Sequence, residues 1–358
     1  MTAEERRGEA HRPLTRRAAA PRALAALALA ALAAGCSAPA PGPAPAPDPE
    51  QGPEGPDRTA ELLVQVTSVH EETGMTLLEG PTFAPDGGLL VVDVTAPPEK
   101  PKVLRVDTGS GEVSPVFSGG DGVYTSAQFG PRDDRLYLTD FLNGRIDSIT
   151  PDGEDHTTFF SGDVDGAPMH PDDLAFDEAG NMYVSDSTGF SGPAWEARGR
   201  VVRIDGETAE ATVLAEDLPA PNGISFNEDF TALWVGQYAA NRIDHYLLGE
   251  GGTTVESSHA AVYFDGGTSR IDSIAVDADG NLYQAVHGQP RVFVYSSTGE
   301  HLATVGVPDD AAGGLDTATN VAIAPGTTDA YMTVSGEDGG FVYTFDALAE
   351  GIRQSNGG

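Results

Sequence analysis

The stretch LAFDEAGNMYVSD, from Leu174 to Asp186, contains the pattern that decides the fold. An apolar pair leads into a turn rich in Asp and Gly, and a strand of alternating apolar residues follows. Related stretches recur as PTFAPDGGLLVVD from Pro81, AQFGPRDDRLYLTD from Ala127, ISFNEDFTALWVG from Ile224, IAVDADGNLYQAV from Ile274 and VAIAPGTTDAYMTV from Val321. The apolar residues that anchor the six copies lie 46, 47, 50, 50 and 47 residues apart: Phe83, Phe129, Phe176, Phe226, Val276 and Ile323. Such a period predicts one supersecondary unit for each copy.

Each copy continues into further segments with period-two alternation, such as residues 102–106 and 291–295, so one face of each segment can be buried. Four-stranded units of this length are typical of propeller blades. The sequence therefore predicts an all-β fold, a six-bladed β-propeller with four-stranded blades. We expect residues 61–70 to pair with the last blade near residues 340–345 and close the ring, which would remove an open sheet edge. A row of separate β-domains is the alternative, and the even period without linkers argues against it.

The composition excludes some classes of partner. With 55 acidic and 20 basic residues, the chain has a formal net charge of −35, which repels phosphate backbones. We therefore expect no nucleic-acid partner, and we expect a monomer. The one cysteine, Cys36, rules out a disulfide within the chain, so the fold must depend on a packed core.

Residues 1–35 are predicted to be a lipoprotein signal peptide. Several Arg residues precede a short apolar segment at 23–34, and small residues then lead to Cys36. This order is typical of a secretory signal, and the Cys at the junction resembles a bacterial lipobox, in which that Cys is acylated. An ordinary signal with a chance Cys is the alternative, and the pair Arg16-Arg17 leaves twin-arginine export open beside the general secretory route.

Residues 36–60 follow as the acylated Cys and a Pro-rich linker. Dense Pro favours an extended polyproline II conformation over a packed core. The predicted propeller domain then spans residues 61–350. We expect this domain to lie outside the cytoplasm, held at the cell membrane only through the lipid anchor.

One position in every repeat carries a side-chain oxygen. Four residues before each anchor lie Glu79, Thr125, Asp172, Asn222, Asp272 and Thr319. The first strand of a propeller blade lines the central channel, so these positions should form a ring around its mouth. Two carboxylates about 4 Å apart repel by roughly 4 kcal/mol at an effective dielectric near 20, so the converging acids need a cation or acquire raised pKa values.

The donor types indicate which cation this ring would hold. Carboxylate and amide oxygens, without Cys or clustered His, suit Ca²⁺ better than Zn²⁺, and Mg²⁺ and Mn²⁺ stay open. The alternative is that these residues are polar caps at strand starts. We prefer that alternative for Thr125 and Thr319.

Several motifs resemble the gluconolactonase/regucalcin (senescence marker protein) family over residues 75–345. They are Leu78-Glu79-Gly80-Pro81, Pro221-Asn222-Gly223-Ile224, Ile271-Asp272-Ser273 and Asp279-Gly280-Asn281-Leu282-Tyr283. The pairs Asp172-Asp173 and Asp272-Ser273 are most similar to the drug-responsive lactonase branch. The resemblance implies a six-bladed, calcium-dependent hydrolase of lactones or related esters.

The resemblance also implies roles for individual residues. Glu79, Asn222 and Asp272 would bind the metal. Asp172 would lie beside the ion and the substrate and is also a candidate metal ligand, and Ser273 would be an additional ligand. Sugar-lactone members of the family carry an Arg that binds substrate hydroxyls, and this chain has His170 at that position. The resemblance therefore does not imply a gluconolactone-like substrate.

The mechanism expected from these residues is attack by water on a metal-polarised carbonyl. Asp272 or Asp172 would be the general base. The candidate substrate-binding residues are Thr125, His170 and His287. The competing hypothesis is a non-enzymatic, metal-stabilised propeller lipoprotein that binds a ligand or protein partner, because the fold alone does not determine function.

Overall fold

The computed structural model describes residues 57–353. The predicted signal peptide at 1–35, Cys36 and nearly all of the predicted linker lie outside the described residues. Within residues 57–353, three short 3-10 helices accompany the strands: η1 (Ala194–Glu196), η2 (Tyr238–Ala240) and η3 (Glu250–Gly252). None of the helices in this part of the chain has the length and apolar character needed to cross a membrane.

Four separate sheets each consist of four antiparallel strands. The first contains β3 (Leu78–Phe83), β4 (Leu89–Asp93), β5 (Val103–Val106) and β6 (Val113–Phe117). The second contains β7 (Tyr124–Phe129), β8 (Leu136–Asp140), β9 (Arg145–Ile149) and β10 (Thr157–Ser161). The third contains β11 (Pro171–Phe176), β12 (Met182–Asp186), β13 (Gly199–Ile204) and β14 (Ala211–Leu218). The fourth contains β15 (Pro221–Phe226), β16 (Ala232–Gln237), β17 (Arg242–Leu248) and β18 (Val255–Tyr263).

The other strands form a single nine-stranded sheet. One run contains β19 (Arg270–Val276), β20 (Leu282–His287), β21 (Arg291–Tyr295) and β22 (His301–Gly306), with β1 (Arg58–Thr59) parallel to β22. A second run contains β23 (Thr317–Ile323), β24 (Asp329–Gly336), β25 (Gly339–Asp346) and β2 (Glu61–Thr67). One residue pair, His287 with Thr317, joins the two runs.

The prediction of an all-β propeller with four-stranded blades is therefore confirmed, but the predicted set of six separate blades is not. The structure has four separate four-stranded sheets, and its remaining strands belong to one sheet. The reason is local, because the end of β20 and the start of β23 come close enough to form a bridge. A sequence period cannot show such a bridge between consecutive repeats.

The predicted closing strand is present. β2 pairs antiparallel with β25, from Glu61 opposite Thr344 to Thr67 opposite Gly340. The strand ends at Thr67, three residues before the predicted boundary. A segment from the beginning of the described chain thus completes a sheet made by its end.

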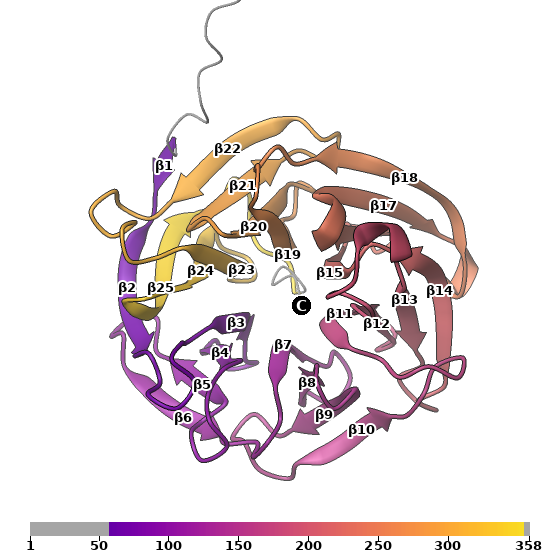
Figure 1. The fold of residues 1–358 in the computed structure, drawn as a ribbon, viewed down its shortest axis with the longest axis horizontal. Helices are drawn as coiled ribbons and strands as arrows, with labels where there is room; N and C mark the ends of the chain where they lie inside the picture. The colour runs from indigo at the N-terminus through magenta and orange to yellow at the C-terminus, as the bar shows by residue number, and fades with distance from the viewer. Residues whose placement is uncertain (1–56, 354–358) are drawn as a thin grey trace, which may run out of the picture. The chain divides into compact units, whose positions relative to one another are not determined.

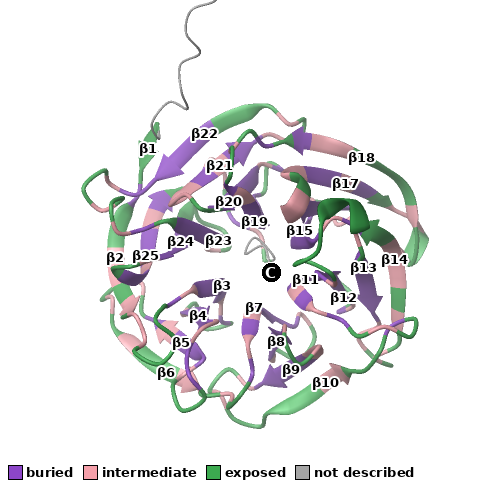
Figure 2. Ribbon diagram, viewed as in Figure 1, coloured by how far each residue is buried: buried purple, intermediate pink, exposed green. Residues whose placement is uncertain are grey.

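The sheets are arranged radially around a central axis (Figure 1). The strands nearest the axis are β3, β7, β11, β15, β19 and β23, which are the first strands of the six repeats. Burial follows the same arrangement, because the inner strands are buried and exposed segments lie toward the rim (Figure 2). The beginnings of the inner strands therefore meet around one end of the axis.

The hydrophobic core lies between the sheets. In the described part of the chain, six clusters of buried apolar residues each draw on two consecutive repeats. Strand β4 shows how alternation produces this division: Leu90 and Val92 pack toward the next repeat, whereas Leu89 and Val91 pack toward the last. Burying such a side chain contributes about 1.5–3 kcal/mol, so every interface adds stability on both faces of a sheet.

The inner strands approach one another closely beside Glu79. Gly80 has a φ of 48°, and a Cβ at that position would lie 2.7 Å from the backbone N of Ala127 on β7. Any other residue would therefore have both an unfavourable backbone conformation and a clash with a neighbouring main chain. Gly80 consequently sets the distance between β3 and β7.

We expect Gly80→Ala to lower the free energy of unfolding by about 2–4 kcal/mol, from backbone strain plus displacement of β7. Gly87→Ala is the matched control, since Gly87 also has a positive φ, of 87°, but a Cβ there would meet nothing within 4 Å. Gly87→Ala should lower the free energy of unfolding by about 1–2 kcal/mol. Urea denaturation measures both values, and equal losses would contradict the role given to the close approach.

Candidate functional site

A β-bulge occurs at the start of all six inner strands. The pairing register shifts between Pro171 and Leu174 in β11, and similar shifts occur in β3, β7, β15, β19 and β23. A bulge interrupts the ladder and redirects side chains, so two consecutive residues can approach the axis. The predicted ring positions Asp172, Asn222 and Asp272 all lie inside these bulges.

Direct contacts bring the ring residues together. The Asn222 Nδ2 donates a hydrogen bond to Asp172 Oδ2 at 3.2 Å, although the two residues are 50 positions apart in the chain. The Ser187 hydroxyl donates to the same oxygen at 3.1 Å. The Asp172 carboxylate is thus held by two donors in a fixed orientation.

Three other side-chain oxygens at this site are buried without a hydrogen-bond donor. They are Glu79 Oε2, Asn222 Oδ1 and Asp272 Oδ2, on residues that are 7%, 9% and 3% exposed. A buried acceptor left without a partner costs about 1–3 kcal/mol, and more when it is charged. Three such acceptors at the starts of inner strands β3, β15 and β19 indicate a site whose natural partner is a positive charge.

The pKa values of the acids reflect the same crowding. Burial raises the pKa of Glu79 well above its usual value, and the charges of Asp272, Asp173 and Asp172 raise it further. Burial followed by repulsion from Asp172 also raises the pKa of Asp272. Burial raises the pKa of Asp172 to about 7, against the hydrogen bond from Ser187, which favours the charged form.

The donor types fit a hard divalent cation. No three His, Cys, Asp or Glu side chains between residues 57 and 353 are placed as a ready-made metal site. The unpartnered set instead includes the amide oxygen of Asn222 beside carboxylates, a mixture that Ca²⁺ accepts. Zn²⁺ would favour His and Cys ligands, which this set lacks.

Comparison with known proteins identifies the family of this chain. The model of the SMP-30/Gluconolactonase/LRE-like region matches residues 77–336. The chain belongs to this family. Lactonase drp35 of Staphylococcus saprophyticus is 29% identical over 282 residues, which cover 76% of this chain and 84% of that protein.

Solved structures show the same fold at lower sequence identity. A gluconolactonase from Xanthomonas campestris is 18% identical, with a TM-score of 0.62 over 81% of this chain and 99% of that one. A calcium-binding protein, regucalcin, from Agrobacterium tumefaciens is 17% identical, with a TM-score of 0.62 over 82% and 99% of the two chains. The predicted resemblance to the gluconolactonase/regucalcin family is thus confirmed.

The ring in this SMP-30/gluconolactonase family member contains a further acid that the sequence argument passed over. Asp173 is 1% exposed, its Oδ2 has no hydrogen-bond partner, and burial followed by repulsion from Asp172 raises its pKa. A single position per repeat selected Asp172 alone, because the repeat alignment does not show the bulge. Two consecutive Asp residues at a strand start are the signal that could have revealed it.

Ser273 and Thr125 lie beside the acids. Ser273 is 1% exposed and hydrogen-bonds to Asp173, which lowers the pKa of that carboxyl. The Thr125 hydroxyl donates to the backbone oxygen of Asp172 at 2.9 Å and lies 3.1 Å from the Thr139 hydroxyl. This contact ties β7 to β11, and a role for Thr125 in substrate binding stays a prediction.

The two predicted histidines have different surroundings. His287 Nδ1 lies 3.9 Å from Asp272 Oδ2, and burial lowers the pKa of this His. His170 Nδ1 instead lies 3.1 Å from the Phe141 carbonyl oxygen, and its ring packs 5.4 Å from Phe141 and 6.2 Å from Phe190. The structure thus places His287 next to the acids and holds His170 in an aromatic cluster.

A cavity of about 460 Å³ opens beside His287. Met75 and Leu77 line it together with Asp316 and Thr317. Its volume is within the range of small-molecule sites. The metal-binding, catalytic and substrate-binding roles predicted for the individual residues stay predictions, while the structure places Glu79, Asp172, Asn222 and Asp272 around one end of the inner strands.

The raised pKa of Asp172 predicts how the stability of the metal-free protein changes with pH. Its value of about 7 exceeds the ordinary 3.8, so the folded chain binds the proton more tightly than the unfolded chain between these values. Stability therefore falls as pH rises from about 4 to 7. We expect the Tm measured by calorimetry with a chelator to decrease over this window.

Asp172→Asn is the control for this prediction, because the negative charge of the whole chain also lowers stability as pH rises. The substitution removes one titrating group and its repulsion of Asp173 and Asp272. Its Tm should therefore decrease less steeply with pH. If Tm decreases equally steeply with pH in the wild type and in Asp172→Asn, the raised pKa assigned to Asp172 is contradicted.

Proposed function

We propose that this chain is a calcium-dependent hydrolase of lactones or related esters. The observation that carries the proposal is the set of buried, unpartnered oxygens of Glu79, Asn222 and Asp272 beside a fixed Asp172. Membership of the SMP-30/gluconolactonase family and the similarity to lactonase drp35 support it. The regucalcin neighbour, a calcium-binding protein, supports Ca²⁺ over Mg²⁺ or Mn²⁺.

The proposal includes a ring of six blades. The nine-stranded sheet would count as two of them, β19–β22 and β23–β25 with β2, joined by the single pair of His287 and Thr317. The six apolar clusters of residues 57–353, each shared by two consecutive repeats, support this count. The bridge would then be a local contact between neighbouring blades.

Glu79, Asn222, Asp272 and Ser273 would hold the ion. A bound Ca²⁺ would supply Lewis-acid polarisation of the substrate carbonyl and stabilise negative charge on its oxygen. Asn222 has a second function, because its Nδ2 donates to Asp172 while its Oδ1 is unpartnered. One amide would thus link the metal ligands to the residue beside them.

Asp172 is the better candidate for the general base. Its Oδ2 accepts hydrogen bonds from Asn222 and Ser187, which leaves Oδ1 to take a proton from water. The residue is also more exposed than Asp272, which is 3% exposed. His287, next to Asp272, would carry a proton toward solvent.

The substrate would be a small lactone or ester that does not need a cationic side chain to bind sugar hydroxyls. His170, in place of the Arg of sugar-lactone members, packs against Phe141 and Phe190, whose rings also contact each other, so the three form an aromatic cluster. The cavity beside His287 also has apolar walls from Met75 and Leu77. These features favour a substrate with an apolar portion.

We expect Asp172→Asn and Asp272→Asn to lower kcat for lactone hydrolysis by about 10²–10⁴-fold, the usual contribution of a positioned acid or base. Only Asp272→Asn should also weaken Ca²⁺ binding in calorimetry, since Asp172 is assigned to proton transfer. Asp279→Asn, the same change in an exposed turn, is the control and should keep full activity.

The competing function is a metal-stabilised propeller that binds a ligand or protein partner without catalysis. Both functions predict that a chelator lowers Tm and that added Ca²⁺ restores it. They differ in turnover. If the wild-type chain saturated with Ca²⁺ cleaves neither lactones nor aryl esters in a broad panel, the hydrolase proposal fails and the binding function takes its place.

We also propose that the protein is a lipid-anchored, monomeric, extracytoplasmic lipoprotein whose partner is the small-molecule substrate. The sequence around Cys36 supports this proposal, through its basic segment, apolar segment and small residues. A lipid on Cys36 and the Pro-rich residues that follow would place the propeller at a distance from the membrane.

We expect Cys36→Ser to abolish incorporation of radiolabelled palmitate and to release the protein from the membrane fraction. Acylation needs the thiol, and the chain has no second Cys to replace it. Labelling of the variant at the wild-type level would contradict the proposed anchor. A Ser37→Ala variant serves as the control and should be labelled normally.

A further inference from the structure

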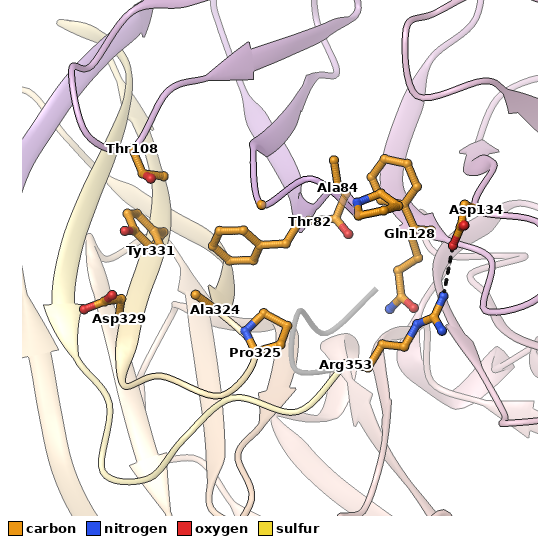
Figure 3. A pocket seen from close by; sticks show the side chains of 14 residues that line it. Thr82, Ala84, Thr108, Gln128, Asp134, Ala324, Pro325, Asp329, Tyr331 and Arg353 are labelled. Carbon is orange, nitrogen blue, oxygen red and sulfur yellow. Dashed lines mark hydrogen bonds and ion pairs between the residues drawn. The ribbon is translucent and has the colours of Figure 1, made fainter.

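A second cavity lies at the opposite end of the inner strands from the acids. Its volume is about 480 Å³, and Thr82, Phe83, Gln128, Tyr331 and Arg353 are among its lining residues (Figure 3). Phe83 is the last residue of β3, whereas Glu79 is the second. At about 3.3 Å per residue, roughly 13 Å of strand separates the two positions, so this cavity is distinct from the proposed active site.

Gln128 gives this cavity a specific chemical feature. The residue is 1% exposed, and neither its Nε2 nor its Oε1 has a hydrogen-bond partner. Figure 3 shows its amide directed into the cavity, between Thr82 and Arg353. A buried amide needs both an acceptor and a donor, and a bound molecule with an amide edge can supply the two together.

The walls around this amide combine polar groups with an apolar side formed by aromatic rings and Pro325. The rings of Phe83 and Tyr331 pack edge to face with centroids 5.6 Å apart, and Pro325 also lines the cavity (Figure 3). Flat apolar walls with a few convergent polar groups are typical of small-molecule sites. The ligand should therefore be flat over most of its surface and polar at one edge.

The charged lining residues disfavour an anion. The Arg353 guanidinium is 3.4 Å from Asp134 Oδ1 and 3.4 Å from the Gly130 carbonyl oxygen, so its charge is already directed to protein acceptors. Asp134 and Asp329 add negative charge around the cavity. A carboxylate or phosphate would be repelled, whereas a neutral molecule would not.

The segment that carries Arg353 is firmly held. Gly351 forms bridges with Asp277 and Pro325, and a Cβ on Gly351 would lie 2.4 Å from the Ile323 carbonyl oxygen. This segment crosses from the repeat of β19 to that of β7, where Arg353 contacts Gly130. One wall of the cavity is thus fixed by pairing to two other repeats.

We propose that this cavity is a binding site for a small, neutral, flat molecule with an amide edge, such as an aromatic carboxamide or a lactam. One ligand N–H would donate to Gln128 Oε1, and the adjacent ligand carbonyl would accept from Gln128 Nε2. The ring would lie against Phe83 and Tyr331. The proposal does not depend on the hydrolase function.

Benzamide, N,N-dimethylbenzamide and benzoate test the proposal by isothermal titration calorimetry on the full chain. Benzamide should bind saturably with a Kd of about 1 mM, as expected for a ligand of this size. The dimethyl amide lacks the donor and benzoate carries a charge, so both should bind at least about tenfold more weakly. No saturable benzamide binding up to about 10 mM would overturn the proposal, as would equal binding of the dimethyl amide.

The Gln128→Leu variant tests whether benzamide binds in this cavity. The variant should fold, because it replaces an unpartnered buried amide with an apolar group of similar size, and it should bind benzamide at least about tenfold more weakly. Gln65→Leu is the matched control, since Gln65 lies on β2 and donates to the Thr67 and Asp338 carbonyl oxygens. Wild-type affinity in Gln128→Leu would overturn the assignment even if benzamide binds.

Discussion

The close approach of the inner strands to one another is the constraint on which the rest of this molecule depends. A Cβ on Gly80 would lie 2.7 Å from the main chain of β7, and a Cβ on Gly223 would lie 2.6 Å from the Asp272 carbonyl oxygen. Glycine at these two positions lets strands from different repeats come within reach of each other's side chains. The hydrogen bond from Asn222 to Asp172 joins another neighbouring pair, β15 and β11, and it too requires inner strands that lie close together.

Concentrating acids at the axis costs stability that the interfaces between sheets must supply. Burial raises the pKa values of Glu79, Asp173 and Asp272, and their mutual repulsion adds to this effect. The apolar clusters on both faces of the sheets offset the cost, since strands such as β4 are buried along their whole length. Stability and site chemistry are thus divided between the interfaces and the axis, a separation that lets a propeller vary its function without losing its fold.

The sequence was sufficient for the repeat, the propeller class and the closing strand, because each depends on a pattern of apolar residues that recurs along the chain. It also located Glu79, Asp172, Asn222 and Asp272, since equivalent positions in a repeat occupy equivalent places around an axis. Asp173 was missed because a bulge adds a residue that a repeat alignment does not register. The bridge between His287 and Thr317, the aromatic packing of His170 and the unpaired amide of Gln128 depend on contacts between repeats, which no period contains.

The pairing of β2 with β25 has a consequence for the order in which the molecule is built. Glu61 and Thr344 come from opposite ends of the described chain, so their contact cannot form until Thr344 has been synthesised. Contacts of such long sequence separation form late and slowly, whereas each repeat can begin to fold as soon as it emerges. A nascent or prematurely terminated chain would therefore carry two unpaired strand edges, and quality-control proteases could recognise an incomplete product by those edges.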